Sequence, residues 1–393
     1  MQSIYKTISI LSLIFSLIAC NSKTNNDKTI LAAGLLFLQN QKSNSGIGGP
    51  TATRVYAQLG SFTTNTTNKG GVSANSFYAP NGIALDSSGN LYVADSSNNR
   101  VLYYPSNSTT ATRVYGQGGS FTTNNSETGA VSASSLAAPG AVIVDSSGGV
   151  YISSSGRVLY YSSGSTTATR VYGQGGNFTT STINLGGITA NSLSGPAGLA
   201  LDSNNGLYVA DYSTSRVLYY PSGSTTATRV YGQLGSFTNS IVDPRNVTAD
   251  TLYTPTGVIV DKSDNLYVAD TSNNRVLYYP SGSIVPTKVY GQSDFTSSST
   301  LNTSNSSLGG PNFLTLDSNG GLYVSTGENR VVYFPSGSTT ATKVYGQGGS
   351  FTSRIQNNGG VSANSLSNPT GMAIDSIGRL YIADFGNSRI LYY

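Results

Sequence analysis

One motif recurs six times along this chain of 393 residues and constrains its fold more than any other feature. The copies are spaced at intervals of 59, 57, 59, 56 and 58 residues and start at Pro80, Pro139, Pro196, Pro255, Pro311 and Pro369. Each continues as short stretches of β-branched and aromatic residues between Gly, Ser, Asn and Pro, which is typical of strands joined by turns. A unit of this size buries its faces only by packing against its neighbours. We therefore predict an all-β, six-bladed β-propeller of four-stranded antiparallel blades, numbered 1 to 6 from Pro80.

The two ends of the repeat region predict how the ring closes. The last copy stops after its third strand at residues 390–393, and an unmatched fourth strand at residues 53–58 stands before the first copy. We expect the N-terminal strand to complete the C-terminal blade, because closure removes the exposed sheet edges of an open array. The propeller domain is therefore expected over residues 51–393.

The motif resembles a known repeat. Residues 80–101 follow the pattern Pro-x-Gly-Ile-Ala-x-Asp-x-x-Gly-x-Leu-Tyr-Val-Ala-Asp-x-x-Asn-x-Arg-Val, which is similar to the core of NHL repeats. The similarity extends over nearly all of residues 51–393. It implies a propeller but leaves function open, since NHL-type propellers include protein-binding modules, RNA-binding domains and a few lyases.

The first 50 residues indicate export and anchoring. Residues 1–19 have a basic start and a short apolar stretch, as a signal peptide does. Leu17-Ile18-Ala19-Cys20 resembles the lipobox of bacterial lipoproteins, which implies lipidation of Cys20; the alternative is an ordinary signal peptide cut near Ala19. Residues 20–50 are then a flexible tether. The apolar run 30–38 is too short to cross a bilayer, so we expect a short helix on the propeller or at the membrane surface. The expected location is the exported side of a bacterial envelope membrane, inner or outer.

Several kinds of chemistry are excluded by composition. The chain has no histidine and one cysteine, Cys20. It therefore has no Ser-His-Asp triad, no His-ligated zinc and no cysteine nucleophile in the mature domain. Lyases of the propeller type rely on histidine, so the resemblance does not extend to them. A net charge of +4, widely spread, argues against nucleic acid. We expect no catalytic residue.

A column of aspartates follows the innermost strand of every blade: Asp86, Asp145, Asp202, Asp261, Asp317 and Asp375. One interpretation is a carboxylate ring that binds a cation, with calcium as the candidate cofactor. The interpretation that we favour is that each Asp accepts hydrogen bonds from its own hairpin turn, because every blade has the same turn. We therefore expect no metal or cofactor.

A second acidic column lies at the end of the next strand. Asp95, Asp211, Asp270 and Asp384 are each followed five residues later by an arginine. Blades 2 and 5 have shorter loops there and carry Ser154 and Thr326 instead, which favours a role in bracing the loop. Of the 27 tyrosines, 23 occupy repeated strand positions, so they are expected to pack between blades. The long connections between blades each carry a phenylalanine, and we expect its ring to insert into the outer wall of the propeller: Phe62, Phe121, Phe178, Phe237 and Phe351.

The binding face is predicted from departures from symmetry. The shortened loops of blades 2 and 5 stand opposite each other and are expected to leave a trough. The connection before blade 4 carries charges that its sister connections lack, Asp243, Arg245 and Asp250. These three residues are either part of a partner site or the product of drift in one connection. We predict a monomeric, lipid-anchored module that binds a protein or a glycan and meets the membrane only through its anchor. The alternatives are a calcium-dependent hydrolase or lactonase and a structural envelope protein.

Overall fold

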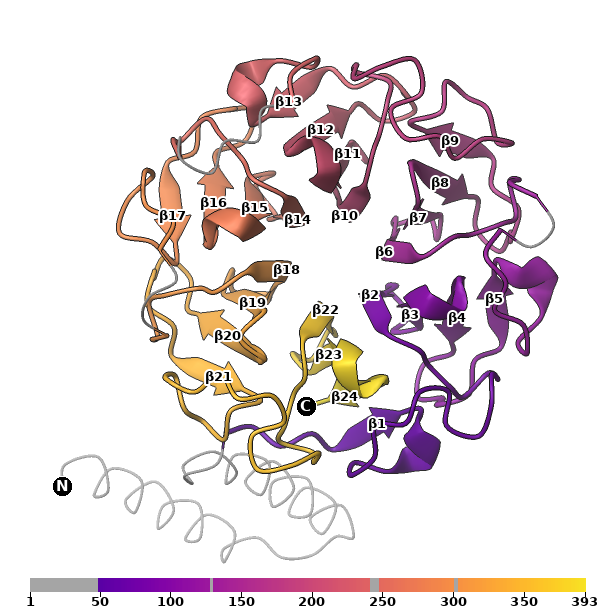
Figure 1. Ribbon diagram of the computed structural model, residues 1–393, viewed down its shortest axis with the longest axis vertical. Coiled ribbons are helices and arrows are strands. Elements are labelled where there is room, and N and C mark those ends of the chain that lie inside the picture. Colours follow the sequence, from indigo (N-terminus) through magenta and orange to yellow (C-terminus); the bar gives the residue numbers. More distant parts are fainter. Residues whose placement is uncertain (1–48, 128–129, 241–246, 300–302) are drawn as a thin grey trace, which may run out of the picture. The chain divides into compact units, whose positions relative to one another are not determined.

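The computed structural model describes residues 49–127, 130–240, 247–299 and 303–393. Cys20, the expected signal peptide, residues 30–38 and nearly all of the tether lie outside the described residues, as do Asp243 and Arg245. The described part consists of strands and short 3-10 helices, arranged as six four-stranded sheets around a central opening (Figure 1). None of its helices has the length and apolar character needed to cross a membrane.

Each blade is one antiparallel meander with its first strand at the centre of the ring. Blade 1 consists of β2 (Pro80–Leu85), β3 (Leu91–Asp95), β4 (Arg100–Tyr104) and β5 (Arg113–Tyr115). Blade 2 consists of β6 (Pro139–Val144), β7 (Val150–Ser154), β8 (Arg157–Tyr161) and β9 (Arg170–Tyr172). Blade 3 consists of β10 (Pro196–Leu201), β11 (Leu207–Asp211), β12 (Arg216–Tyr220) and β13 (Arg229–Tyr231).

The second half of the ring repeats this plan. Blade 4 consists of β14 (Pro255–Val260), β15 (Leu266–Asp270), β16 (Arg275–Tyr279) and β17 (Lys288–Tyr290). Blade 5 consists of β18 (Pro311–Leu316), β19 (Leu322–Thr326), β20 (Arg330–Phe334) and β21 (Lys343–Tyr345). Blade 6 consists of β22 (Pro369–Ile374), β23 (Leu380–Asp384), β24 (Arg389–Tyr392) and, from the other end of the chain, β1 (Arg54–Tyr56).

The ring closes as predicted. Strand β1 is the outer strand of blade 6 and pairs antiparallel with β24, with Arg54 opposite Tyr392 and Tyr56 opposite Ile390. The backbone N–H of Thr53 also donates to the carbonyl of Tyr392 at 2.7 Å. No blade is therefore left with an unpaired third strand.

Aromatic rings join neighbouring blades, as the tyrosine pattern predicted. In every blade the tyrosine of the outermost strand meets, edge to face, an aromatic ring at the end of the third strand of the next blade or directly after it. The ring centroids are 5.1–5.6 Å apart in the pairs Tyr56–Tyr104, Tyr115–Tyr161, Tyr172–Tyr220, Tyr231–Tyr279, Tyr290–Phe334 and Tyr345–Tyr393. These rings belong to six hydrophobic clusters, each of which spans two blades. The core is therefore continuous around the ring.

The innermost strands approach each other so closely that the third residue of the motif is constrained. It is glycine in blades 1, 3, 4 and 6. A Cβ on Gly82 would lie 2.6 Å from the Cα of Ala141 and 2.7 Å from the carbonyl oxygen of Gly140 in the neighbouring blade. Real Cβ atoms do not approach backbone that closely, so a side chain at this position forces two blades apart.

We expect Gly82→Ala to destabilise the propeller by about 2–3 kcal/mol, because the added methyl group overpacks backbone that cannot move alone. The matched control is Ala141→Gly, the reverse change in the same column. That control should cost only about 1 kcal/mol, because it removes one buried methyl group without forcing a contact. Urea unfolding of both variants measures the difference, and equal losses would show that the close approach is unimportant.

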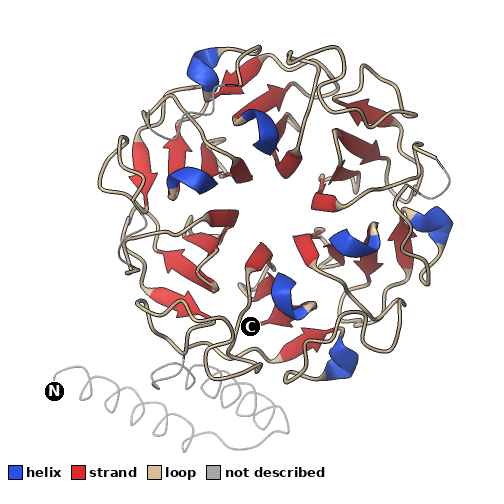
Figure 2. Cartoon of the chain, in the orientation of Figure 1, coloured by secondary structure: helices blue, strands red, loops and turns tan. Residues whose placement is uncertain are grey.

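The two faces of the ring differ. The loop face carries the turns between second and third strands and the long connections between blades. Four of those turns hold a 3-10 helix beside the central opening: η2 (Ser96–Asn98), η4 (Tyr212–Thr214), η6 (Thr271–Asn273) and η7 (Phe385–Asn387). Figure 2 shows that the opposite blades 2 and 5 have none. The hairpin face carries the turns between first and second strands. Three further 3-10 helices follow outermost strands: η1 (Gln58–Gly60), η3 (Gln117–Gly119) and η5 (Gln233–Gly235).

Candidate functional site

The first aspartate column lies on the hairpin face, and each member braces its own turn. One oxygen of Asp86, Oδ1, accepts hydrogen bonds from the backbone N–H of Ser88 at 2.9 Å and of Asn90 at 3.0 Å. The same two bonds, to the second and fourth residues after the aspartate, recur at Asp145, Asp202, Asp261, Asp317 and Asp375. One carboxylate oxygen per blade is thus committed to the turn.

The second carboxylate oxygen, Oδ2, has a partner of one of two kinds. In blades 1, 4 and 6 it is the side chain at the end of the turn: Asn90 at 2.8 Å, Asn265 at 2.9 Å and Arg379 at 2.6 Å. In blades 2, 3 and 5 that position is glycine, and a tyrosine hydroxyl takes its place. Tyr219 donates to Asp202 Oδ2 at 2.9 Å.

The glycine is what admits the tyrosine. A Cβ on Gly206 would lie 2.5 Å from both the Tyr219 hydroxyl and Asp202 Oδ2. Burial and the bond to Asp202 raise the pKa of Tyr219 to about 12, and burial and the bond to Asp317 do the same for Tyr333 in blade 5. The side chain at the end of the turn and the tyrosine hydroxyl are therefore alternative donors to the second oxygen of the aspartate.

This geometry favours the bracing role over a cation site. Each of the six carboxylates accepts bonds within its own blade, and Asp375 also pairs with Arg379. Within the described ranges, no three His, Cys, Asp or Glu side chains gather closely enough to hold a metal ion. The ring places one carboxylate per blade around the mouth, without the convergence that calcium coordination needs.

The hairpin face is hollowed beside the ring. A cavity of about 550 Å³ lies over blades 4 to 6, with Val260, Leu316 and Ile374 as apolar wall. A second cavity of about 400 Å³ lies over blades 6 and 1, and both are lined by Asp375. A small molecule that reached the carboxylate ring would occupy these hollows.

The second acidic column is a set of buried ion pairs at the loop face. Arg100 is fully buried, and its Nε donates to Asp95 Oδ2 at 2.8 Å. Its other nitrogens donate to the carbonyls of Phe121 at 2.5 Å and Ser76 at 3.0 Å. Asp95 Oδ1 accepts from the N–H of Tyr78 at 2.8 Å. Burial raises the pKa of Asp95, and Arg100 opposes that effect. The pair thus fastens the connections that enter and leave the blade.

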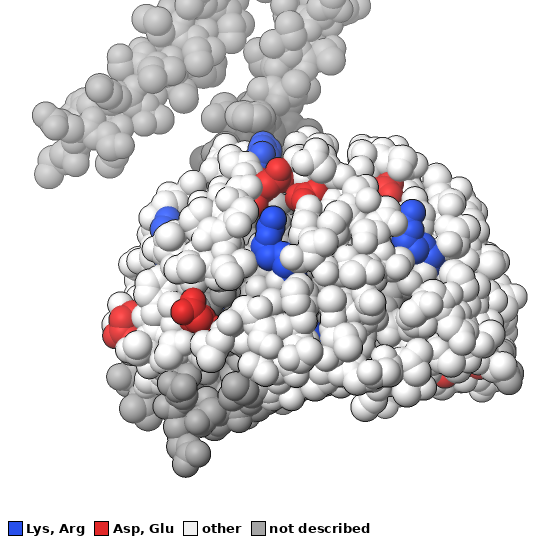
Figure 3. Space-filling view, turned by 90° about the horizontal axis from the view of Figure 1, so that it is seen from above, with Lys and Arg blue, Asp and Glu red and all other residues white. Residues whose placement is uncertain are grey.

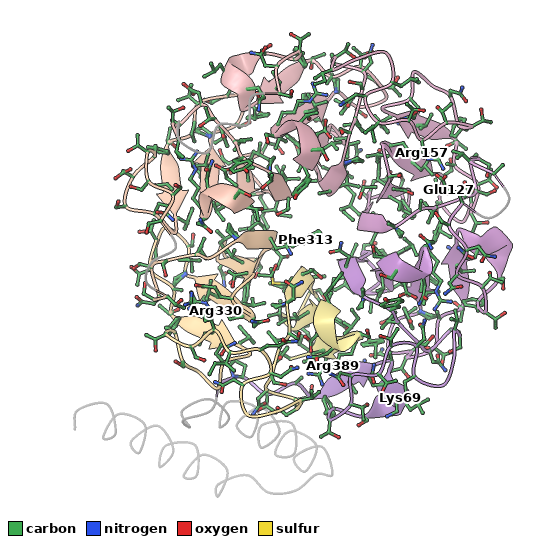
Figure 4. The ribbon with its side chains drawn as sticks, in the orientation of Figure 1. Lys69, Glu127, Arg157, Phe313, Arg330 and Arg389 are labelled. Atoms are coloured by element: carbon green, nitrogen blue, oxygen red, sulfur yellow. The ribbon has the colours of Figure 1, made fainter. Side chains whose placement is uncertain are left out.

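Blades 2 and 5 also have the buried arginine, but its acidic partner is a glutamate at a different position from the repeated aspartate. Glu328 accepts two bonds from Arg330, at 2.5 and 3.0 Å, from within the shortened turn. Glu127 comes from the connection before blade 2 and lies 3.7 Å from Arg157 (Figure 4). These are the only glutamates in the chain. The aspartate is absent from these two blades, as the sequence shows, but a glutamate pairs with each arginine instead, and the sequence analysis missed these two glutamates.

The six buried arginines also position the phenylalanines of the long connections. Each arginine donates to the carbonyl of one phenylalanine, at 2.5–2.7 Å, in the connection that leaves its blade. The rings of the five phenylalanines named in the sequence analysis pack against the hydrophobic clusters, which confirms their predicted packing role. The sequence prediction left out Phe295, whose connection is shorter and whose ring packs in the same way.

Phe313 crosses the central channel. It belongs to β18 in blade 5, at the column position that is glycine in four other blades. Its side chain packs against the hydrophobic cluster of blades 2 and 3, which includes Ala141 and Leu199. Blade 5 adjoins neither of those blades, so the ring of Phe313 must span the opening, where Figure 4 places it. The ring of Phe313 therefore projects into the channel near the loop face.

Aromatic residues outside the repeated positions lie on the loop face. Tyr78 and Tyr253 lie two residues before the innermost strands of blades 1 and 4, and Tyr212 and Phe385 begin η4 and η7. Tyr78 and Tyr212 are each 44% exposed. The sequence analysis left Tyr78, Tyr212 and Tyr253 outside the 23 tyrosines at repeated positions and assigned them no role.

The predicted partner site near the connection before blade 4 is described only in part. Asp250 is exposed, and its carbonyl accepts from the N–H of Leu234 at 3.3 Å. Leu234 is 64% exposed and has a positive φ of 56°, at a position that is glycine in three other blades. A partner role for Asp243, Arg245 and Asp250 stays a prediction.

Comparison with known proteins identifies the repeat. The family model described as NHL repeat matches residues 77–104, 193–220, 252–279 and 366–392. These segments are blades 1, 3, 4 and 6, the four that have the aspartate–arginine pair and the 3-10 helix. The chain therefore carries NHL repeats, and blades 2 and 5 depart from them where the loop is shortened. No curated protein matches the chain in sequence.

Solved structures match the fold at low identity. A protein of unknown function from Bacteroides thetaiotaomicron is 17% identical, with a TM-score of 0.58, over 88% of this chain and 76% of that one. A gluconolactonase from Xanthomonas campestris is 14% identical, with a TM-score of 0.52, over 87% and 98%. A virginiamycin B lyase from Staphylococcus aureus is 12% identical, with a TM-score of 0.44, over 81% and 80%. At these identities the first two share the fold with this chain and indicate no activity.

Proposed function

We propose that this NHL-repeat propeller is a lipid-anchored binding module of the bacterial cell envelope, which presents its loop face to a macromolecule or a glycan. The observation that carries the proposal is that the repeated polar and aromatic side chains have structural roles, whereas the aromatic residues outside the repeat are left on the surface. The repeated aspartates, arginines and tyrosines are engaged in turns, ion pairs and blade packing. The exposed aromatic residues that break the repeat lie on the loop face.

The anchor in this proposal is Cys20, at the end of the lipobox-like sequence Leu17-Ile18-Ala19-Cys20. It is the only cysteine in the chain, so no disulfide competes for the thiol. A single acyl chain binds membranes weakly, and stable anchoring requires more than one. The tether over residues 20–50 then gives the propeller freedom to reach a partner away from the membrane.

The hydrolase alternative has no support from the described side chains. Asp261, Asp317 and Asp375 line the larger hairpin-face hollow, but each accepts hydrogen bonds from its own turn, and among the described residues no three acidic groups gather closely enough to hold a metal ion. The chain also lacks an imidazole to serve as acid or base near neutral pH.

Anchoring is tested by growing a bacterial host that expresses the full chain with labelled palmitate. We expect the wild-type chain to incorporate label and to sediment with membranes, and Cys20→Ala to lose the label, because no other thiol can be acylated. Ser22→Ala, two residues away, is the matched control and should retain it. Absence of label from the wild type, or its persistence in Cys20→Ala, contradicts the anchor.

A further inference from the structure

Four aromatic residues surround the loop-face mouth, one in each helix-bearing blade. Blades 1 and 4 carry theirs two residues before the innermost strand, and blades 3 and 6 carry theirs at the start of the 3-10 helix. The two positions are neighbours in space. In blade 1 the N–H of Ser97 donates to the carbonyl of Tyr78 at 3.2 Å, and in blade 3 the N–H of Tyr212 donates to Gly195 at 2.9 Å.

The two positions are used alternately. Where one holds an aromatic residue, the other holds a small one: Tyr78 with Ser96, Tyr212 with Ser194, Tyr253 with Thr271, and Phe385 with Ser367. Blades 2 and 5 have neither an aromatic residue nor a helix here. The aromatic residues therefore form two pairs of adjacent blades, 3 with 4 and 6 with 1, on opposite sides of the opening (Figure 1).

The surroundings of these rings are polar but uncharged. The four 3-10 helices consist of Ser, Thr, Asn, Gly and the aromatic residues. In the turns between second and third strands that the structure describes, Glu328 is the only charged side chain past the buried aspartates, and it is 8% exposed and bound to Arg330. Figure 3 shows that charges are also sparse on the outer edge of the ring.

Polar groups line the mouth itself. The second residue of the innermost strand is Asn81, Thr256, Asn312 or Thr370 in four blades, and the hydroxyl groups of Thr256 and Thr370 donate to backbone carbonyls of the neighbouring blades. Asn81 Oδ1 is buried without a hydrogen-bond partner. Immediately below, the ring of Phe313 projects into the channel, so we expect a ligand of this mouth to lie across the opening.

We infer that the loop-face mouth binds a neutral oligosaccharide laid across the opening between the two aromatic pairs. This inference rests on the proposed binding function and names its ligand. The C–H faces of sugar rings pack on aromatic rings, and their hydroxyl groups pair with amide and hydroxyl side chains. The lack of exposed charge in the turns that carry the aromatic residues disfavours a charged ligand there, whether nucleic acid or an acidic polysaccharide.

The test is titration calorimetry of the full chain, in detergent, with four neutral hexasaccharides: cellohexaose, laminarihexaose, maltohexaose and chitohexaose. Polygalacturonate serves as the charged comparison. The key variant is Tyr78→Ala/Tyr212→Ala, which removes the most exposed ring of each pair. Tyr78→Phe/Tyr212→Phe keeps both rings. Ile377→Ala is the matched control, because Ile377 is 71% exposed on the opposite, hairpin face.

We expect at least one neutral hexasaccharide to bind and the double alanine variant to weaken its Kd about tenfold or more, the scale of losing two stacking contacts. The phenylalanine variant and Ile377→Ala should keep most of the affinity, and all variants should melt near the wild-type temperature because the changed side chains are exposed. Binding that survives the double alanine change overturns the aromatic site but leaves the binding function intact. Binding of polygalacturonate alone, or of no saccharide, overturns the inference. A protein partner lost with the two tyrosines also overturns it.

Discussion

Raising the pH above about 10 is expected to unfold this propeller abruptly, because its tyrosines are buried where they cannot ionise. Burial raises the pKa of the second-strand tyrosines well above the ordinary value: Tyr92, Tyr151, Tyr208, Tyr267, Tyr323 and Tyr381. It does the same for the third-strand tyrosines at the blade interfaces: Tyr104, Tyr161, Tyr220, Tyr279 and Tyr393.

The sign of the effect follows from linkage. Above pH 10.0, the ordinary tyrosine pKa, the unfolded chain releases phenolic protons that the folded chain retains, so the free energy of unfolding falls as pH rises. Each tyrosine contributes at most about 1.4 kcal/mol per pH unit. Eleven such groups together give a slope of up to roughly 15 kcal/mol per pH unit, which is comparable to the whole stability of an ordinary domain.

The measurement is a pH titration that follows tyrosinate absorbance in the near ultraviolet and the β-sheet signal in circular dichroism. Both should change together in one steep transition. The same chain in guanidinium chloride is the control and should titrate smoothly near pH 10, the usual value for an exposed phenol. A smooth titration with an unchanged β-sheet signal would mean that the tyrosines are accessible and that the packing between blades is looser than described.

Replacing a buried arginine of the second column is expected to be the most destabilising single change. Arg100→Met should cost roughly 3–5 kcal/mol, because it leaves Asp95 charged and buried without its partner. It also removes the donors to the carbonyls of Phe121 and Ser76. The effect is read from the midpoint of chemical unfolding.

The matched control is Arg113→Met on the outer strand of the same blade. Arg113 lies 4.8 Å above the ring of Tyr103 and is only partly buried, so its loss should cost less than about 1 kcal/mol. Adding Asp95→Asn to Arg100→Met should recover part of the stability, since it removes the stranded charge. Equally small losses of unfolding free energy in Arg100→Met and Arg113→Met would show that the buried ion pair does not hold the connections of the blade in place.

The periodic parts of the fold could be predicted from the sequence. Repetition at a fixed interval identified the blades, the closing strand and the packing role of tyrosine, because each is one local solution used in every copy. The interaction partners of individual side chains were harder to predict from the sequence. Glu127 and Glu328 replace the missing aspartates from different places in the chain, and only their being the sole glutamates hinted at it.

Contacts across the ring were beyond sequence reasoning. Phe313 is visible in the sequence as a departure from glycine, but its contact with blades 2 and 3 depends on the width of the channel. The donor to each carboxylate in the first column also depends on geometry, since Tyr219 reaches Asp202 only past Gly206. The trough predicted across blades 2 and 5 stays a prediction, although the structure does place the two short turns opposite each other.

The closing strand β1 has a mechanical consequence. Any pull transmitted from a membrane anchor near Cys20 would arrive at residue 49 and meet the hydrogen bonds of Ala52 and Thr53 first. The next resistance is β1, which spans three residues and is held to β24 by one edge only. Tension from the N-terminal side would therefore open the ring at blade 6 before it strained any other blade, so this strand sets the force that the closed ring withstands.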